Sequence, residues 1–179
     1  MHKLRDAPGE AEARLRSELE AYAGEGPVHV LGLGYTDKAD DGAGILVAEE
    51  LKKPFPSYSH SEHDGVEGVV LDICESPGPG TVFFVDAAEL HSEPGTIRVV
   101  RSEDIYDREV TTHRVPVVLL STMLERSGKR VAVICIQPGS IEFMAAVSEE
   151  VVEAIRLVAS AMERIMRDRN EAGRRPLGK

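Results

Sequence analysis

The sequence contains no tryptophan, and phenylalanine and tyrosine supply only 4% of its 179 residues. Proteins that bind single-stranded nucleic acid stack the bases on aromatic side chains, which are scarce here. Basic residues are also few, with 21 Lys and Arg against 31 Asp and Glu and a formal net charge of −10. Because nucleic-acid binding relies on basic side chains that neutralise phosphates, we expect no nucleic-acid partner.

Cysteine is equally sparse. Cys74 and Cys135 lie in or beside apolar runs, so we predict core thiols in a reducing, cytoplasmic compartment. No apolar run approaches the roughly 20 residues that a membrane-spanning helix needs. The charged N-terminus lacks the apolar centre of a signal peptide. The composition therefore favours a cytoplasmic protein without membrane insertion.

The order of apolar patterns predicts an α/β fold. We expect a helical extension over residues 1–27, one domain over 28–166 and a polar, basic tail over 167–179. Short apolar runs alternate with helical patterns, which indicates a three-layer αβα sandwich on a mostly parallel sheet of about five strands. The expected strands are 28–33, 57–63, 81–86, 95–101 and 131–136, and the expected helices are 10–22, 45–53, 66–75, 115–126 and one that begins after Ser148.

The first expected strand ends in a glycine-containing, acidic turn. Gly32 and Gly34 resemble the start of a dinucleotide fingerprint, but its third glycine would fall at Asp37. A carboxylate there has the wrong sign for a site that holds pyrophosphate on backbone N–H groups. We interpret the glycines as allowing a tight turn and close packing of the following helix, although a nucleotide site stays an alternative.

Three polar residues occupy positions where an α/β protein places its ligands. Asp41 follows the first strand, Asp86 ends the strongest strand, and His113 precedes a later helix. If the two strands are neighbours, both carboxylates meet where the strand order reverses. One histidine with two carboxylates suits a borderline divalent ion such as zinc, nickel or iron. The alternative stays open that both acids cap turns and that His113 lies on the surface.

Two other kinds of site are not supported by the sequence, a helical zinc site and a serine nucleophile. The cluster His60-Ser61-Glu62-His63 does not match a helical zinc motif, and we interpret it as an exposed polar strand. The sequence contains no Gly-x-Ser-x-Gly elbow for a serine nucleophile.

Five blocks follow one another between about residues 28 and 162. They are Leu31-Gly32-Leu33-Gly34 with Asp40-Asp41-Gly42-Ala43-Gly44, Val85-Asp86-Ala87, Pro94-Gly95 with Ile97, Thr111-Thr112-His113 with Pro116, and Ile136-Gln137-Pro138. In this order they resemble the hydrogenase maturation endopeptidases, and the last three are most similar to the branch that serves formate hydrogenlyase-type and archaeal hydrogenases. The resemblance implies a phosphorylase/hydrolase-like fold and a metal-dependent, aspartic-type endopeptidase. Such an enzyme removes the C-terminal extension of a nickel-iron hydrogenase large-subunit precursor after nickel insertion.

The resemblance also implies roles for individual residues. The family's metal ligands correspond to Asp41, Asp86 and His113, and the metal is nickel carried by the substrate, which zinc or cadmium would replace in a crystal. A motif needed for cleavage matches the sequence best at Asp64, which we expect to act as general base. Tyr35 stands where the family usually has asparagine. These two departures keep open the alternative of a non-catalytic metal- or partner-binding relative.

Overall fold

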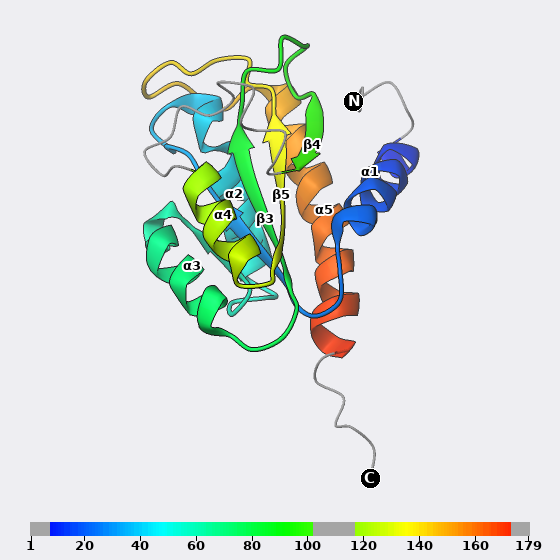
Figure 1. Cartoon of the computed structure of the whole chain (residues 1–179). Helices are drawn as coiled ribbons and strands as arrows, with labels where there is room; N and C mark the ends of the chain where they lie inside the picture. Colours follow the sequence, from blue (N-terminus) through cyan, green and yellow to red (C-terminus); the bar gives the residue numbers. More distant parts are fainter. Residues whose placement is uncertain (1–7, 102–116, 173–179) are drawn as a thin grey trace.

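The computed structural model describes residues 8–101 and 117–172. Five strands form one sheet with helices on both faces (Figure 1). The strands are β1 (Val28–Gly32), β2 (Ser59–Ser61), β3 (Thr81–Ala87), β4 (Ile97–Arg101) and β5 (Arg130–Ile136). The helices are α1 (Pro8–Tyr22), α2 (Ala43–Lys52), α3 (Val66–Glu75), α4 (Val117–Arg126) and α5 (Glu149–Ala172), with short 3-10 turns η1 (Ala39–Gly42) and η2 (Glu62–Asp64).

The strand order across the sheet is β2-β1-β3-β5-β4. β2, β1, β3 and β5 run parallel to one another, and β4 pairs antiparallel with β5 at one edge of the sheet. β1 therefore lies between β2 and β3, so the strand order reverses between β1 and β3. In α/β proteins the loops that leave two such strands diverge, and ligands bind in the crevice at this point of the sheet. The predicted αβα sandwich on a mostly parallel sheet is confirmed.

Two apolar cores hold the layers together. Phe83 is fully buried among the side chains of α1, α2 and α5 on one face of the sheet, and Phe84 is fully buried with those of α3 and α4 on the other. Burying a side chain of this size contributes roughly 1.5–3 kcal/mol. Cys135 lies in the second core and Cys74 packs against it, both as free thiols. This confirms the prediction of core cysteines.

The expected N-terminal helix is present as α1 and docks on this chain. Leu15 and Leu19 are fully buried against the core that contains α5. Beside these leucines, the carboxylate of Glu12 on α1 lies 2.9 Å from the guanidinium of Arg164 on α5. The extension is therefore part of the helical layer.

The polar tail expected from residue 167 needs correction. α5 continues to Ala172, so residues 167–172 are helical. Asn170 explains the difference: it is buried, its Oδ1 accepts a hydrogen bond from Val28 N–H at 2.7 Å, and its Nδ2 donates to the Val28 carbonyl at 3.1 Å. One polar side chain thus ties the last turns of α5 to the start of β1.

The expected exposed strand over 57–63 also needs correction, because β2 is shorter and half buried. Ser59 and Ser61 are fully buried. The Ser59 hydroxyl donates to the Ala48 carbonyl at 2.7 Å, and the Ser61 hydroxyl donates to the Glu49 carboxylate at 2.8 Å. Both partners belong to α2, and because they satisfy the hydroxyls, a polar strand can be buried here.

Among the helices of the described residues, none combines the length and apolarity that a membrane crossing requires.

Candidate active site

Glycines allow the backbone around β1 to pack unusually closely. A Cβ atom on Gly32 would lie 2.1 Å from the carbonyl oxygen of Gly44, and one on Gly44 would lie 2.1 Å from that of Val85. Gly34 has a φ of +134°, which side chains other than hydrogen rarely allow. The first turn of α2 therefore contacts β1 and β3 directly, which confirms close helix packing as the role of these glycines.

Asp41 and Asp86 lie at the crevice between β1 and β3. Asp41 belongs to η1 and is 5% exposed, whereas Asp86 lies near the end of β3 and is fully buried. The pairing of β1 with β3 reaches Gly32 opposite Val85, one residue before Asp86. The two strands are therefore neighbours, which is the condition under which the two carboxylates were expected to meet. Asp86 is the last residue but one of β3, and Asp41 lies in the turn that follows β1.

The two carboxylates interact electrostatically. The pKa of Asp86 is raised well above its ordinary value, first by burial, then by the negative charge of Asp41 and also by that of Glu62, against a hydrogen bond from the backbone N–H of Ala87. Buried acids whose charges repel are typical of functional sites. A cation placed between them would offset both the repulsion and the burial, so these two residues fit a divalent metal ion.

The third predicted ligand, His113, lies outside the described residues. α4 begins at Val117 and packs on the sheet face that contains Phe84, and strand alternation turns Asp86 to the same face. Within residues 8–101 and 117–172, no group of three or more His, Cys, Asp or Glu side chains is arranged to hold a metal ion. The described residues thus supply two of the predicted ligands, and the metal itself stays a prediction.

Asp64, the predicted general base, is engaged elsewhere. Both of its carboxylate oxygens accept hydrogen bonds from the Lys52 ammonium, at 2.7 and 2.8 Å, and one also accepts from Ser61 N–H at 2.9 Å. The bond from Lys52 is the main reason that the pKa of Asp64 is lowered. An acid held ionised in this way caps η2 and is a weaker base than an unpaired one.

Glu62, two residues earlier, is the carboxylate of η2 that reaches the crevice. Its Oε2 accepts a hydrogen bond from Gly34 N–H at 2.9 Å, and its charge acts on Asp86. The polar pattern of residues 57–63 predicts an exposed strand, so Glu62 is not among the site residues that the sequence predicts. The one available signal was its position directly after a short strand that precedes a helix.

Asp40 has a structural role that local sequence patterns do not predict. Its buried carboxylate accepts four hydrogen bonds of 2.7 to 2.8 Å, from Gly139 N–H, Ser140 N–H, and both the N–H and the hydroxyl of Ser148. Burial acts to raise the pKa of Asp40, but these bonds outweigh burial and the pKa is lowered. Asp40 therefore ties the segment between β5 and α5 to the turn that carries Asp41.

Tyr35, which departs from the family pattern, is accommodated within the same turn. The Lys38 ammonium lies 4.8 Å from the centre of the Tyr35 ring, and Lys38 N–H donates to the Tyr35 carbonyl at 3.1 Å. A cation over an aromatic face is an attractive contact. The larger side chain thus contributes to the fold of the turn.

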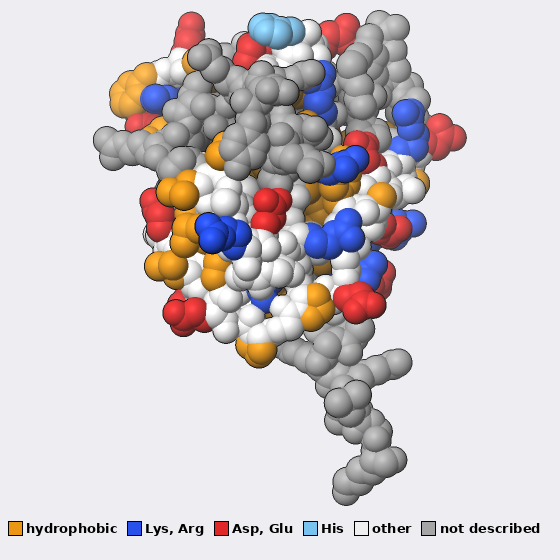
Figure 2. All heavy atoms as spheres, in the orientation of Figure 1, with side chains coloured by type: hydrophobic (Ala, Val, Ile, Leu, Met, Phe, Trp, Pro, Cys, Tyr) orange, Lys and Arg blue, Asp and Glu red, His pale blue; other side chains and the backbone are white. Residues whose placement is uncertain are grey.

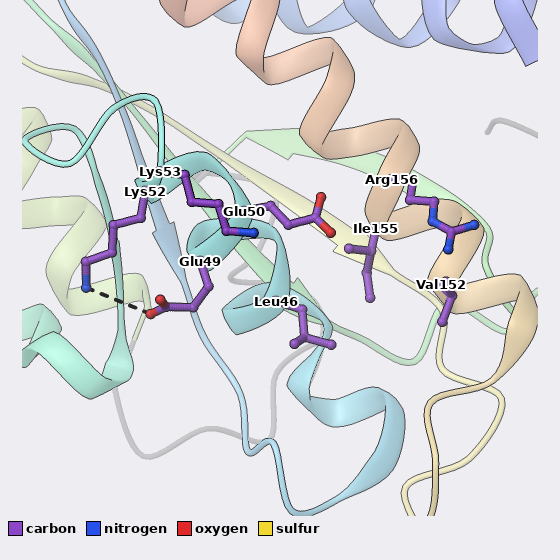
Figure 3. Close-up of a pocket in the computed structure, with 8 residues that line it drawn as sticks. All are labelled: Leu46, Glu49, Glu50, Lys52, Lys53, Val152, Ile155 and Arg156. Carbon is purple, nitrogen blue, oxygen red and sulfur yellow. Dashed lines mark ion pairs between the residues drawn. The ribbon is translucent and has the colours of Figure 1, made fainter.

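A groove of about 510 Å³ lies elsewhere, between α2 and α5 (Figure 3). Figure 3 shows charged side chains from both helices around an apolar floor. The lining residues are Leu46, Glu49, Glu50, Lys52, Lys53, Val152, Ile155 and Arg156. None of them follows a strand or belongs to the carboxylate pair, so the groove is separate from the candidate active site.

Comparison with known proteins identifies the family. The family model described as hydrogenase maturation protease matches residues 68–166, more than half of the chain. The chain belongs to the hydrogenase maturation protease family. It is 28% identical to the hydrogenase 3 maturation protease of Escherichia coli K12 over 137 residues, which cover 75% of this chain and 87% of the relative.

Solved structures of this family share the fold. The NiFe hydrogenase maturation protease HycI from Thermococcus kodakarensis superposes with a TM-score of 0.70 at 26% identity, covering 84% of this chain and 99% of the relative. The endopeptidase HycI from Escherichia coli gives a TM-score of 0.63 at 28% identity, with 77% and 90% covered. The comparisons therefore support an endopeptidase on the αβα fold described above.

Proposed function

We propose that this protein removes the C-terminal extension of a nickel-iron hydrogenase large-subunit precursor after nickel insertion. The observation that carries the proposal is the buried pair Asp41 and Asp86 at the crevice between β1 and β3. Membership of the maturation protease family supports proteolysis as the reaction. In this proposal nickel enters as part of the substrate and is not a resident cofactor.

In the proposed mechanism, Asp41, Asp86 and His113 bind the nickel held by the precursor and thereby position the scissile peptide bond. The charge of the ion would offset the burial and the repulsion from Asp41, which together raise the pKa of Asp86. Recognition of the metal would also explain why the extension is cut only after nickel insertion, since the unloaded precursor supplies nothing to offset the buried charges. Zinc or cadmium would occupy the same ligands in a crystal.

Hydrolysis adds water across the peptide bond, with the hydroxyl going to the carbonyl carbon and a proton to the leaving nitrogen. We assign the general base to Glu62 in preference to Asp64, because Glu62 acts on Asp86 whereas Asp64 is held by Lys52. A second mechanism, in which nickel polarises the carbonyl group without a protein base, predicts that neither η2 carboxylate matters for the rate.

The nucleotide-binding alternative is disfavoured by the turn itself. Gly34 N–H, a donor that a pyrophosphate would need, is already bonded to the Glu62 carboxylate. Asp40 and Asp41 add further negative charge before α2, where a phosphate would need a helix N-terminus free of acids.

The test is cleavage of a purified nickel-loaded precursor, followed by the change in intact mass. We expect trimming by the parental protein, none of the nickel-free precursor, and loss of activity in Asp86→Asn and His113→Ala. Among the η2 variants, Glu62→Gln should lose activity and Asp64→Asn should keep it. An Asp86→Asn variant that trims at the parental rate would contradict the proposed site. If the folded parental protein binds the loaded precursor without trimming it, the chain is the non-catalytic relative.

A further inference from the structure

Large apolar side chains gather at the surface of one loop, residues 139–147, between β5 and α5. Ile141, Phe143 and Met144 are 58%, 69% and 76% exposed. Within the described residues, only two other large apolar side chains are more than half exposed, Leu71 on α3 and Leu119 on α4. Single exposed apolar residues are ordinary, whereas a cluster that contains Phe and Met is typical of a protein-binding surface.

The figures place this loop at one end of the molecule. In Figure 1 it is the gold segment that passes over the upper end of the sheet, where the arrows of β3 and β5 end. Figure 2, in the same orientation, shows hydrophobic side chains at the surface on the upper left, where this loop lies. The apolar cluster is therefore at the same end of the sheet as the candidate active site.

The loop is held in place by the turn after β1. Asp40 accepts hydrogen bonds from Gly139 and Ser140 at one end of the loop and from Ser148 just beyond the other. In between, Met144 N–H donates to the Asp37 carbonyl at 2.7 Å, and Met144 has a φ of 60°, a conformation uncommon for a bulky side chain. A backbone held in this way loses little freedom when a partner binds.

These anchors indicate the partner. Asp37 and Asp40 precede Asp41 in the same turn. A precursor whose scissile peptide bond lies at Asp41 and Asp86 therefore also comes close to this loop. The loop carries a single charge, that of Glu142, which suits an apolar patch on the partner. We propose that residues 139–147 form a docking surface for the folded body of the hydrogenase large-subunit precursor. This inference rests on the proposed function.

The experiment compares Ile141→Ser/Phe143→Ser with the control Leu71→Ser/Leu119→Ser, which removes two apolar side chains away from the loop that are 51% and 55% exposed. Initial rates with the nickel-loaded precursor give KM and kcat, and calorimetry with the nickel-free precursor gives affinity without cleavage. We expect the loop variant to raise KM and weaken affinity by about 10-fold or more, with kcat within about twofold of parental. The control should match the parental protein in both.

Parental affinity and KM in the loop variant would overturn the proposal, as would an equal loss in the control. Sedimentation of the protein alone tests whether the loop instead pairs two copies, and a dimer that the loop variant dissociates would also overturn it. If the parental protein does not trim the loaded precursor, the proposed function fails, and the calorimetric comparison still decides docking by itself.

Discussion

The substitution Asp40→Asn tests whether one buried carboxylate holds the loop between β5 and α5 in place. The side-chain amide offers a single acceptor oxygen where the carboxylate offers two. With that oxygen in the place of Oδ2, the bonds from Gly139, Ser140 and the Ser148 hydroxyl persist, but the amide NH2 faces the N–H of Ser148. A buried donor without a partner costs roughly 1–3 kcal/mol, and the remaining bonds lose the strengthening that charge provides.

We therefore expect Asp40→Asn to lower the free energy of unfolding by about 3–4 kcal/mol, a large share of the roughly 5–15 kcal/mol typical of a domain. For a chain of this size that corresponds to a fall in Tm of about 10 °C. Urea unfolding followed by circular dichroism, in buffer containing a chelator, measures the change. Limited chymotrypsin digestion should also cut the variant faster at Phe143, which lies in the released loop and is already 69% exposed.

The pH dependence provides an independent check. Because hydrogen bonds lower the pKa of Asp40 in the folded protein, its contribution to stability is complete above the ordinary aspartate pKa of about 4 and is lost as the pH falls through the folded value. The difference between the parental protein and Asp40→Asn should therefore shrink in acid. Asp37→Asn, an exposed neighbour in the same turn, should change stability by less than about 0.5 kcal/mol. Equal unfolding midpoints for the two variants at pH 7 would refute the reasoning.

Three further predictions concern packing and charge. Gly44→Ala should cost more than about 3 kcal/mol or prevent folding, because its Cβ would lie 2.1 Å from a carbonyl oxygen of β3, whereas Gly68→Ala, with open space in α3, should stabilise by up to about 1 kcal/mol. Asn170→Ala should cost roughly 2 kcal/mol, because it leaves both backbone groups of Val28 without their partner. Asp86→Asn should raise Tm at pH 7 in chelator, since burial and Asp41 raise the pKa of Asp86 and the charged form disfavours the folded state.

The same urea and thermal measurements check all three. A Gly44→Ala protein as stable as Gly68→Ala would contradict the close contact of α2 with the sheet. An Asn170→Ala protein with parental stability would show that the last turns of α5 do not hold β1. For Asp86→Asn the gain should disappear as the pH falls below the ordinary aspartate value, where the parental side chain is protonated in both the folded and unfolded states. A gain that persists there would have another cause.

Most of the fold follows from local patterns in the sequence. The continuous apolar run of β3 and the apolar spacing of three or four in α3 determine their structure, and both elements lie where the patterns predict. The acid that ends β3 and the acids after β1 were also recognisable, because a parallel sheet collects its ligands beyond strand ends. His113 was selected in the same way and lies outside the described residues.

Only the tertiary structure distinguishes the structural carboxylates from those at the candidate active site, because local sequence patterns do not predict hydrogen-bond partners that are distant in the chain. Asp40 and Asp41 are adjacent aspartates, yet Asp40 accepts hydrogen bonds from residues about 100 positions away, while the charge of Asp41 acts on Asp86. Asp64 is only the nearest match to a family motif, and it pairs with Lys52. Glu62, two residues earlier, accepts a hydrogen bond from Gly34 N–H in the turn after β1 instead. The sequence by itself determined the layers and placed acidic residues at the carboxyl end of the sheet. Only long-range contacts distinguish the acids that hold the fold together from those proposed for the active site.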